Sequence, residues 1–183
     1  YKRQLLYCMD SNDYQPDKLY GPYDWIHFDQ IAWYRKQSAR FTKENNGNPV
    51  PALAFFHIPL LEYNEIAGDG KTFGNNREGE VASANINSGM FASFIDMKDV
   101  MGVFAGHDHD NDYLGINKGI VLGYGRVTGA DAYGELTRGA RIIELYEGKF
   151  RFDTWITTPS GREATYYYPS GLNSEEERTA DYL

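Results

Sequence analysis

Two short apolar runs constrain the fold of this chain more than any other feature. Residues 51–57 (PALAFFH) and 100–105 (VMGVFA) have the length of strands, and in neither do apolar and polar residues alternate. Strands buried on both faces have this pattern, which is typical of parallel sheets in α/β proteins. Residues 28–44 and 88–99, which come before these runs, carry apolar residues at helical spacing. The order of these segments predicts helical crossovers between parallel strands.

The rest of the chain extends this pattern and then changes it. Residues 4–9 predict a first strand, and residues 61–66 leave room for one helical turn inside a long polar loop. Beyond residue 112, the turn sequences NKG and EG predict two antiparallel hairpins. The predicted fold class is therefore α/β with a mixed sheet and C-terminal antiparallel hairpins. The hairpin strands are expected at residues 113–116, 120–124, 140–146 and 149–157.

Length and charge limit the classes of protein to consider. With 183 residues the chain is long enough for one domain with its own core. We expect this domain to occupy residues 1–158, and residues 159–183 to form a polar surface tail. The net charge of −8 argues against a nucleic-acid partner, which would need clustered lysine and arginine. The single cysteine, Cys8, excludes an internal disulfide, and no apolar run is long enough to span a membrane.

The segment that follows the second apolar run carries the strongest chemical signal. In the sequence GHDHDND, His107 and His109 stand two residues apart among carboxylates such as Asp108. Residues at i and i+2 of an extended chain point the same way, and ligands bind at the carboxyl ends of strands in α/β sheets. Imidazole binds Zn, Fe and Mn ions, and nearby aspartates can fix the ring tautomers. The loop therefore predicts a metal site.

His57 ends the first apolar run in the same way. If the two runs are neighbouring strands, three imidazoles face one cleft. Taken alone, a histidine at a strand end such as His57 is more often an ordinary surface residue than a metal ligand. His27 lies at the start of a predicted helix, where capping or packing is expected. Aspartates near residues 10–17 have the composition of a turn and are not expected to be ligands.

Three segments together resemble a known family. AFFHIPLLEY, VFAGHDHDNDYLG and YGRVTGADAYG are similar to parts of the C-terminal half of calcineurin-like metallophosphoesterases, in the branch of small purple-acid-phosphatase-like enzymes. The resemblance runs from about residue 5 to about residue 158. It implies half of a β-sandwich flanked by helices, and a metal-dependent hydrolase acting on a phosphoester substrate.

The resemblance also implies roles for single residues. Two ions, drawn from Fe, Zn and Mn, would be bound, the first by His57 and His107 and the second by His109. Glu62, Tyr63 and Arg126 are expected to face the substrate, although Arg126 could equally make a structural contact in its glycine-rich loop. Asp108, Asn111 and Asp112 are expected to support the ligands or fix their loop.

The early motifs of that family, D-x-H, G-D-x-x-D and G-N-H, do not occur in this sequence. We therefore expect the chain alone to bind metal weakly or to be metal-free, and to be inactive. Half a sandwich would leave an apolar sheet face and a strand edge uncovered, so we expect it to associate with an N-terminal half or with itself. Relatives in this branch are often exported, which favours an extracytoplasmic location.

Two readings from other classes remain open. The histidines could serve a non-catalytic module that binds a metal or a phosphate ligand. The 15 tyrosines could instead serve a domain that contacts carbohydrate or protein. Tyrosine is spread along the chain and not clustered, so this last signal is diffuse.

Overall fold

A computed structural model describes residues 3–68 and 72–171, and it shows a layered α/β fold. The central layer is a five-stranded sheet with the order β1-β2-β3-β5-β4. The strands β1, β2, β3 and β5 pair in parallel in this order. At the edge of the sheet, β4 pairs with β5 in the antiparallel direction. The bounds are β1 (Leu5–Cys8), β2 (Ala52–Phe55), β3 (Val100–Ala105), β4 (Leu114–Asn117) and β5 (Ile120–Tyr124). The predicted parallel strands and the first hairpin are confirmed.

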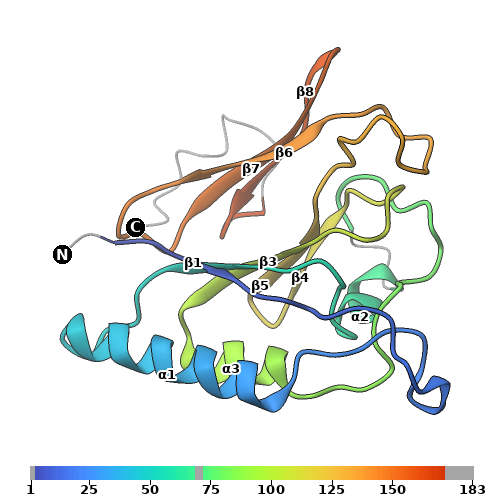
Figure 1. The fold of residues 1–183 in the computed structure, drawn as a ribbon. Helices are drawn as coiled ribbons and strands as arrows, with labels where there is room; N and C mark the ends of the chain where they lie inside the picture. The colour runs from blue at the N-terminus through green and yellow to red at the C-terminus, as the bar shows by residue number, and fades with distance from the viewer. Residues whose placement is uncertain (1–2, 69–71, 172–183) are drawn as a thin grey trace.

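Helices cover one face of this sheet (Figure 1). The helix α1 (Phe28–Glu44) buries Ile31, Tyr34 and Ser38, which lie three to four residues apart on one side. His27 takes the N-cap position of α1, where its N–H donates to Gln30 Oε1 at 2.8 Å. The remaining helices are α2 (Tyr63–Ala67), α3 (Met90–Met97) and a 3₁₀ turn at Lys18–Tyr20. All the predicted helical segments are therefore present.

A second, three-stranded antiparallel sheet covers the other face, with the order β6-β7-β8. Its strands are β6 (Ala140–Leu145), β7 (Phe152–Thr158) and β8 (Gly161–Tyr168). Phe152 and Tyr166 of this sheet pack against Leu53, Phe104 and Val121 of the first. The prediction of a tail from residue 159 onward is wrong for β8, because this strand pairs with β7 and buries Tyr166. Residues 172–183 of the predicted tail lie outside the described residues.

A buried carboxylate joins the helical layer to the sheet. Asp99, just before β3, accepts hydrogen bonds from the hydroxyls of Tyr7 at 2.9 Å and Tyr34 at 2.5 Å. Burial and the neighbouring Asp99 charge raise the pKa of both tyrosines. Because Tyr7 lies on β1 and Tyr34 on α1, this cluster fixes three elements relative to one another.

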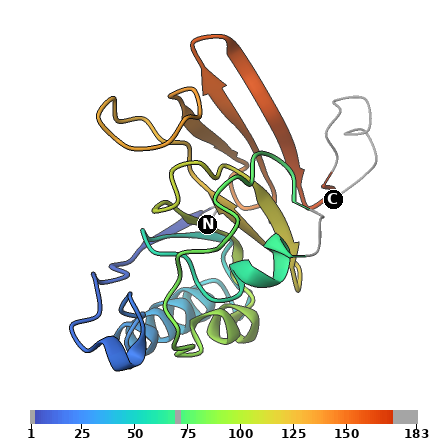
Figure 2. The ribbon, with the colours of Figure 1, turned by 90° about the vertical axis from the view of Figure 1, so that its right-hand side faces the viewer.

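The expectation of an uncovered sheet face is wrong for the described residues, because helices and the second sheet cover the two faces of the five-stranded sheet (Figure 2). What remains open is a groove of about 440 Å³ between the sheets, lined by Phe55, Phe104 and Ile143 among others. The edge strand β1 also exposes Leu6, which is 56% accessible. In the described part of the chain, no helix is both long and apolar enough to cross a membrane.

Candidate metal centre

Two histidines meet at the carboxyl ends of neighbouring strands. His57 follows β2 and His107 follows β3, and these strands pair in parallel. The main chain joins the two strand ends, because Gly106 N–H donates to the His57 carbonyl at 3.0 Å. As a result, His57 Nε2 lies 3.1 Å from His107 Nδ1. The ring centroids are 4.9 Å apart, with the planes nearly perpendicular at 80°.

This spacing fits two ligands of one metal ion. An imidazole nitrogen binds Zn at about 2.0–2.1 Å, so two such nitrogens at octahedral or tetrahedral angles lie about 2.9–3.4 Å apart. The observed 3.1 Å between His57 Nε2 and His107 Nδ1 falls inside that interval. Burial, followed by the nearby His57, lowers the pKa of His107. A lowered pKa favours the neutral imidazole, which is the form that binds a metal.

Local backbone geometry directs both rings to this point. A Cβ atom on Gly106 would lie 3.2 Å from His57 Nδ1, so glycine gives the His57 ring its space. His107 has a left-handed backbone conformation with φ of 76°, which is uncommon for a residue with a side chain. The ring of Tyr23 packs edge-on against His107, at 4.6 Å between centroids. These contacts hold the histidine pair in place within the chain itself.

His109 does not join this pair. Its ring stacks on Tyr133, with centroids 4.0 Å apart and planes at 15°, and its Nδ1 lies 3.2 Å from the Tyr133 carbonyl oxygen. Among residues 3–68 and 72–171, no group of three or more His, Cys, Asp or Glu side chains could hold one ion. The three imidazoles are thus arranged as a pair and a single ring.

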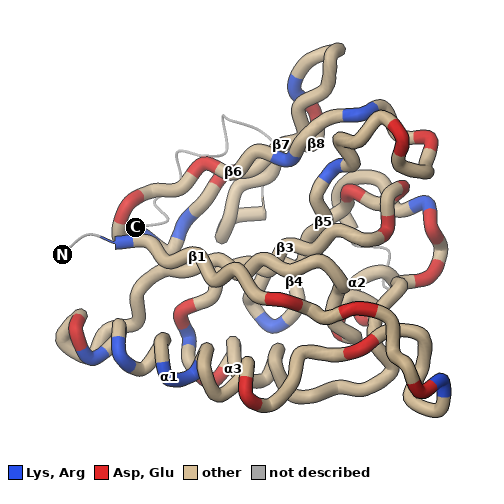
Figure 3. Tube along the Cα trace, in the orientation of Figure 1, with Lys and Arg blue, Asp and Glu red and all other residues tan. Residues whose placement is uncertain are grey.

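All three rings line one open cleft of about 770 Å³. The loops after β1, β2, β3 and β5 and the segment 78–85 form its lining. Acidic residues lie along several of the loops at this end of the molecule (Figure 3). Its described lining includes four carboxylates and no lysine or arginine. The carboxylates are those of Asp13, Glu78, Glu80 and Asp108. The cleft therefore favours cations and disfavours a free phosphate group.

Asp108 and Asn111 of the histidine loop are buried and make hydrogen bonds within the fold. Asp108 Oδ2 accepts from the Tyr124 hydroxyl at 2.6 Å, and burial raises the Asp108 pKa against the opposing effect of that bond. Asn111 Oδ1 accepts from the backbone N–H groups of Arg77 and Glu78 at 2.9 and 3.2 Å. These hydrogen bonds attach the histidine loop to the neighbouring segments of the fold.

Asp112 is fully buried, and it accepts from Asn75 N–H at 2.6 Å and from the Arg126 guanidinium. The idea that nearby aspartates fix the histidine tautomers needs correction for His109. Its ring nitrogen faces a main-chain carbonyl, that of Tyr133, while the Asp108 carboxylate is turned toward Tyr124.

Two of the residues expected to face the substrate do not do so. Tyr63 is fully buried, and its hydroxyl lies 3.0 Å from the carbonyl oxygens of both Val103 and Gly123. Arg126 has a side chain only 3% exposed, and it contacts Asp112, the Thr137 carbonyl and Glu163. Each is a structural residue, because its polar atoms are used inside the fold.

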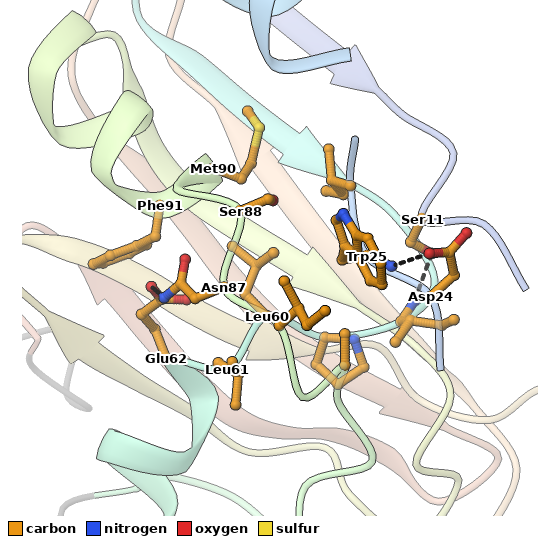
Figure 4. Close-up of a pocket in the computed structure, with 15 residues that line it drawn as sticks. Ser11, Asp24, Trp25, Leu60, Leu61, Glu62, Asn87, Ser88, Met90 and Phe91 are labelled. Carbon is orange, nitrogen blue, oxygen red and sulfur yellow. Dashed lines mark hydrogen bonds between the residues drawn. The ribbon is translucent and has the colours of Figure 1, made fainter. Parts of the chain in front are cut away.

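Glu62 lines a different pocket, shown in Figure 4 beside Asn87, Trp25 and Leu60. Its Oε1 accepts from Asn87 Nδ2 at 2.7 Å. The space there is about 20 Å³, enough for about one water molecule and too small for a substrate. The structure therefore does not bring Glu62 to the histidine cleft.

The sequence reasoning missed Tyr133 and Tyr23, which contact the histidines from distant loops. The only sequence signal for Tyr133 was its place before Gly134 in a glycine-rich loop. Gly134 has φ of 102°, and a Cβ there would come within 2.7 Å of Asp110 Oδ1.

A two-sheet α/β sandwich with imidazoles at adjacent strand ends fits the class of calcineurin-like metallophosphoesterases. Comparison with known proteins gives the branch. Over 158 residues the chain is 39% identical to Probable inactive purple acid phosphatase 29 of Arabidopsis thaliana. Over 152 residues it is 40% identical to Probable inactive purple acid phosphatase 28 of the same plant. Both alignments cover 82% of this chain, and no family model matches it.

A more distant relative is Phosphatase DCR2 of Saccharomyces cerevisiae, 35% identical over 117 residues, which cover 59% of this chain and 19% of the yeast protein. The chain belongs to the purple acid phosphatase-like branch of the calcineurin-like phosphoesterases. It spans 40% and 38% of the lengths of the two plant relatives.

Proposed function

We propose that this chain supplies one side of the active site of a metal-dependent phosphoester hydrolase. The 3.1 Å approach of His57 Nε2 to His107 Nδ1 carries the proposal, since it matches two ligands of one ion. The kinship with proteins named phosphatases supports phosphoesters as the substrate class.

In this proposal His57 and His107 hold one ion, and the Nε2 atom of His109 holds a second. The ions are Fe, Zn or Mn, because imidazole suits these metals. When bound, the pair would activate water and offset the charge that develops on the phosphoryl oxygens. The acidic lining of the cleft makes phosphate binding depend on these cations, because the described lining of the cleft contains no lysine or arginine.

Three imidazoles cannot complete two coordination spheres. We propose that further ligands come from a segment related to the part of the plant proteins that this chain does not match. The groove lined by Phe55, Phe104 and Ile143 and the exposed Leu6 on β1 are where such a segment, or a second copy of the chain, would pack. Light scattering after size-exclusion chromatography distinguishes a monomer from a self-associated form.

We also propose an extracytoplasmic location, which cell fractionation would test.

Metal titration tests the ligand assignment directly. We expect Zn²⁺ to shift, and Mn²⁺ to broaden, the NMR signals of His57 and His107 together, and His57→Ala or His107→Ala to abolish the effect at the other histidine. His27→Ala is the matched control, because His27 lies at the N-cap of α1 and pairs with Asp24 at 3.1 Å. If the two single variants bind these ions as well as the wild type, the proposal fails.

Hydrolysis of p-nitrophenyl phosphate tests the catalytic part. We expect no turnover from the 183-residue chain. We expect metal-dependent turnover from the protein translated from the longest open reading frame that contains this sequence. In that longer protein, His107→Ala should lower the rate by several orders of magnitude. Activity that survives this change would rule out the assignment of His107.

A second candidate is a non-catalytic module that binds a metal or a phosphate ligand. It is favoured by the names of the plant relatives, which are called probable inactive phosphatases. Metal binding without turnover in the longer protein would support it. A tyrosine-based carbohydrate- or protein-contacting surface is less favoured, because several tyrosines are fully buried: Tyr34, Tyr63, Tyr113 and Tyr124.

A further inference from the structure

Tyr133 contacts the histidine loop in three ways, although it lies 24 residues beyond His109. Its hydroxyl oxygen accepts from the His109 backbone N–H at 3.2 Å and donates to the His107 carbonyl at 3.1 Å. Its ring stacks on the His109 imidazole, with 4.0 Å between centroids. Its own carbonyl oxygen lies 3.2 Å from His109 Nδ1. One residue thus touches the backbone of both histidines and the ring of one.

The loop that carries Tyr133 is held firmly by hydrogen bonds. Asp110 Oδ1 accepts from the N–H groups of Glu135 and Leu136, at 2.6 and 2.9 Å. Arg138 donates through Nε to the Gly129 carbonyl at 3.0 Å and through Nη1 to the Gly134 carbonyl at 3.1 Å. Tyr133 itself is 57% exposed, so its place is set by this framework and by the histidines, and not by burial in the core.

We propose that Tyr133 is a positioning residue for the candidate metal ligands. Its carbonyl accepts the Nδ1 proton of His109, which selects the tautomer whose Nε2 carries the free lone pair. The stacked ring keeps the imidazole plane in register with that carbonyl. A histidine ligand of this kind commonly has its other ring nitrogen fixed by such an outer partner.

The hydroxyl has a separate task at His107. The left-handed conformation of His107, with φ of 76°, is costly for a residue with a side chain, and it turns the ring toward His57. The hydrogen bond from the Tyr133 hydroxyl to the His107 carbonyl stabilises this backbone. The ring of Tyr133 therefore acts on His109, and its hydroxyl acts on His107.

This inference rests on the proposed function for its meaning, but it can be measured in the metal-free chain. We would record ¹⁵N–¹H correlations of the histidine rings at about pH 8.5, where imidazole is neutral. The variants are Tyr133→Leu, which loses ring and hydroxyl, and Tyr133→Phe, which loses only the hydroxyl. Tyr20→Phe is the matched control, because Tyr20 is 45% exposed and contacts Trp25.

We expect a single tautomer of His109, protonated at Nδ1, in the wild type, in Tyr133→Phe and in Tyr20→Phe. Tyr133→Leu should show a mixture of both tautomers. In a Zn²⁺ titration, Tyr133→Phe and Tyr133→Leu should both weaken binding at the His57–His107 pair, by about 10-fold to 100-fold, because both lose the hydroxyl that contacts the His107 carbonyl. Only Tyr133→Leu should also weaken binding at His109, because it alone loses the stacked ring. Unchanged thermal unfolding midpoints would show that the variants fold.

An Nε2-protonated His109 in the wild type, or the same tautomer ratio in Tyr133→Leu, would overturn the inference. If Zn²⁺ fails to bind the wild type while the tautomers respond as expected, the assignment of His57 and His107 as a ligand pair within this chain fails and the positioning role of Tyr133 stands. If Zn²⁺ binds the wild type and Tyr133→Leu equally well, with identical tautomers, the metal function stands and Tyr133 is not a positioning residue.

Discussion

Replacing Arg126 with methionine separates a structural role from a substrate-binding role. The guanidinium of Arg126 and the carboxylate of Asp112 have side chains only 3% and 1% exposed, and they form an ion pair. Methionine keeps most of the apolar stem of arginine but removes the charge. Asp112 would then be left as a buried carboxylate that has lost its ion-pair partner, with the charge of the part-buried Arg141 guanidinium still nearby.

The size of the effect follows from what Asp112 keeps. Removing one partner of a buried ion pair destabilises a protein by about 3–5 kcal/mol. Asn75 still donates to Asp112 through its backbone N–H, at 2.6 Å, and through Nδ2, at 3.1 and 3.0 Å. The second carboxylate partner of Arg126, Glu163, has a side chain 50% exposed and adds little. We therefore expect a loss near the lower end, about 3 kcal/mol.

Urea denaturation followed by circular dichroism measures this loss. With a slope of about 2 kcal/mol per molar urea, about 3 kcal/mol lowers the midpoint by about 1.5 M. Arg40→Met is the matched control, because the contacts of Arg40 lie at the surface: an exposed pair with Glu44 at 3.8 Å and a guanidinium 4.3 Å from the centroid of the Phe41 ring. That control should change the free energy of unfolding by less than about 0.5 kcal/mol.

The double variant Arg126→Met with Asp112→Asn should lose less stability than the sum of the two single losses, because it removes both charges of the Arg126–Asp112 pair together. The reasoning is refuted if Arg126→Met unfolds at the same urea concentration as Arg40→Met. If Arg126→Met instead leaves the urea midpoint unchanged and weakens phosphate binding, Arg126 binds the substrate.

Two other predictions concern the histidine pair and the buried tyrosines. Gly106→Ala should weaken Zn²⁺ binding by about 10-fold or more without unfolding the chain, because its Cβ would lie 3.2 Å from His57 Nδ1; an unchanged affinity in calorimetry would refute this. Burial raises the pKa of Tyr113 and Tyr166 to about 12, so the stability that their neutral forms provide is complete below about pH 10 and is lost as the pH rises through about 12. The part of the tyrosinate absorbance that Tyr113→Phe and Tyr166→Phe remove should therefore appear together with unfolding seen by circular dichroism, and its appearance in a folded chain near pH 10 would contradict the assignment.

The sequence predicted the elements whose pattern is set by burial. The strands β2 and β3 are apolar throughout because both faces are covered, and α1 has the bounds predicted for it, residues 28–44. The strand β8 was missed because its first half is polar and exposed, and only Tyr166 and Tyr167 are buried. Because it buries so few residues, β8 resembles a surface tail in its amino-acid sequence. Only its pairing with β7 in the folded chain shows that it is a strand.

The same physics explains which site residues could be found. Position along the chain places His57 and His107 together, because the ends of adjacent parallel strands must meet. It does not reveal whether a nearby polar residue turns outward or inward. Tyr63 and Arg126 turn inward, because each finds buried partners that only the folded chain brings near, the Val103 carbonyl and Asp112.

Tyr133 marks the limit of prediction from the sequence at this site. Its effect on His109 depends on a loop after β5 that reaches back over the loop after β3, and on a carbonyl oxygen that every residue has. A main-chain acceptor leaves no trace in amino-acid type, so the sequence around His109 suggested that the aspartates beside it would fix its tautomer. In the fold, Asp110 acts one step further away, by anchoring Glu135 and Leu136 and so placing Tyr133 against the imidazole. Asp110 of the GHDHDND loop thus bears on the geometry of the candidate ligand His109 indirectly, through the neighbouring loop that it holds.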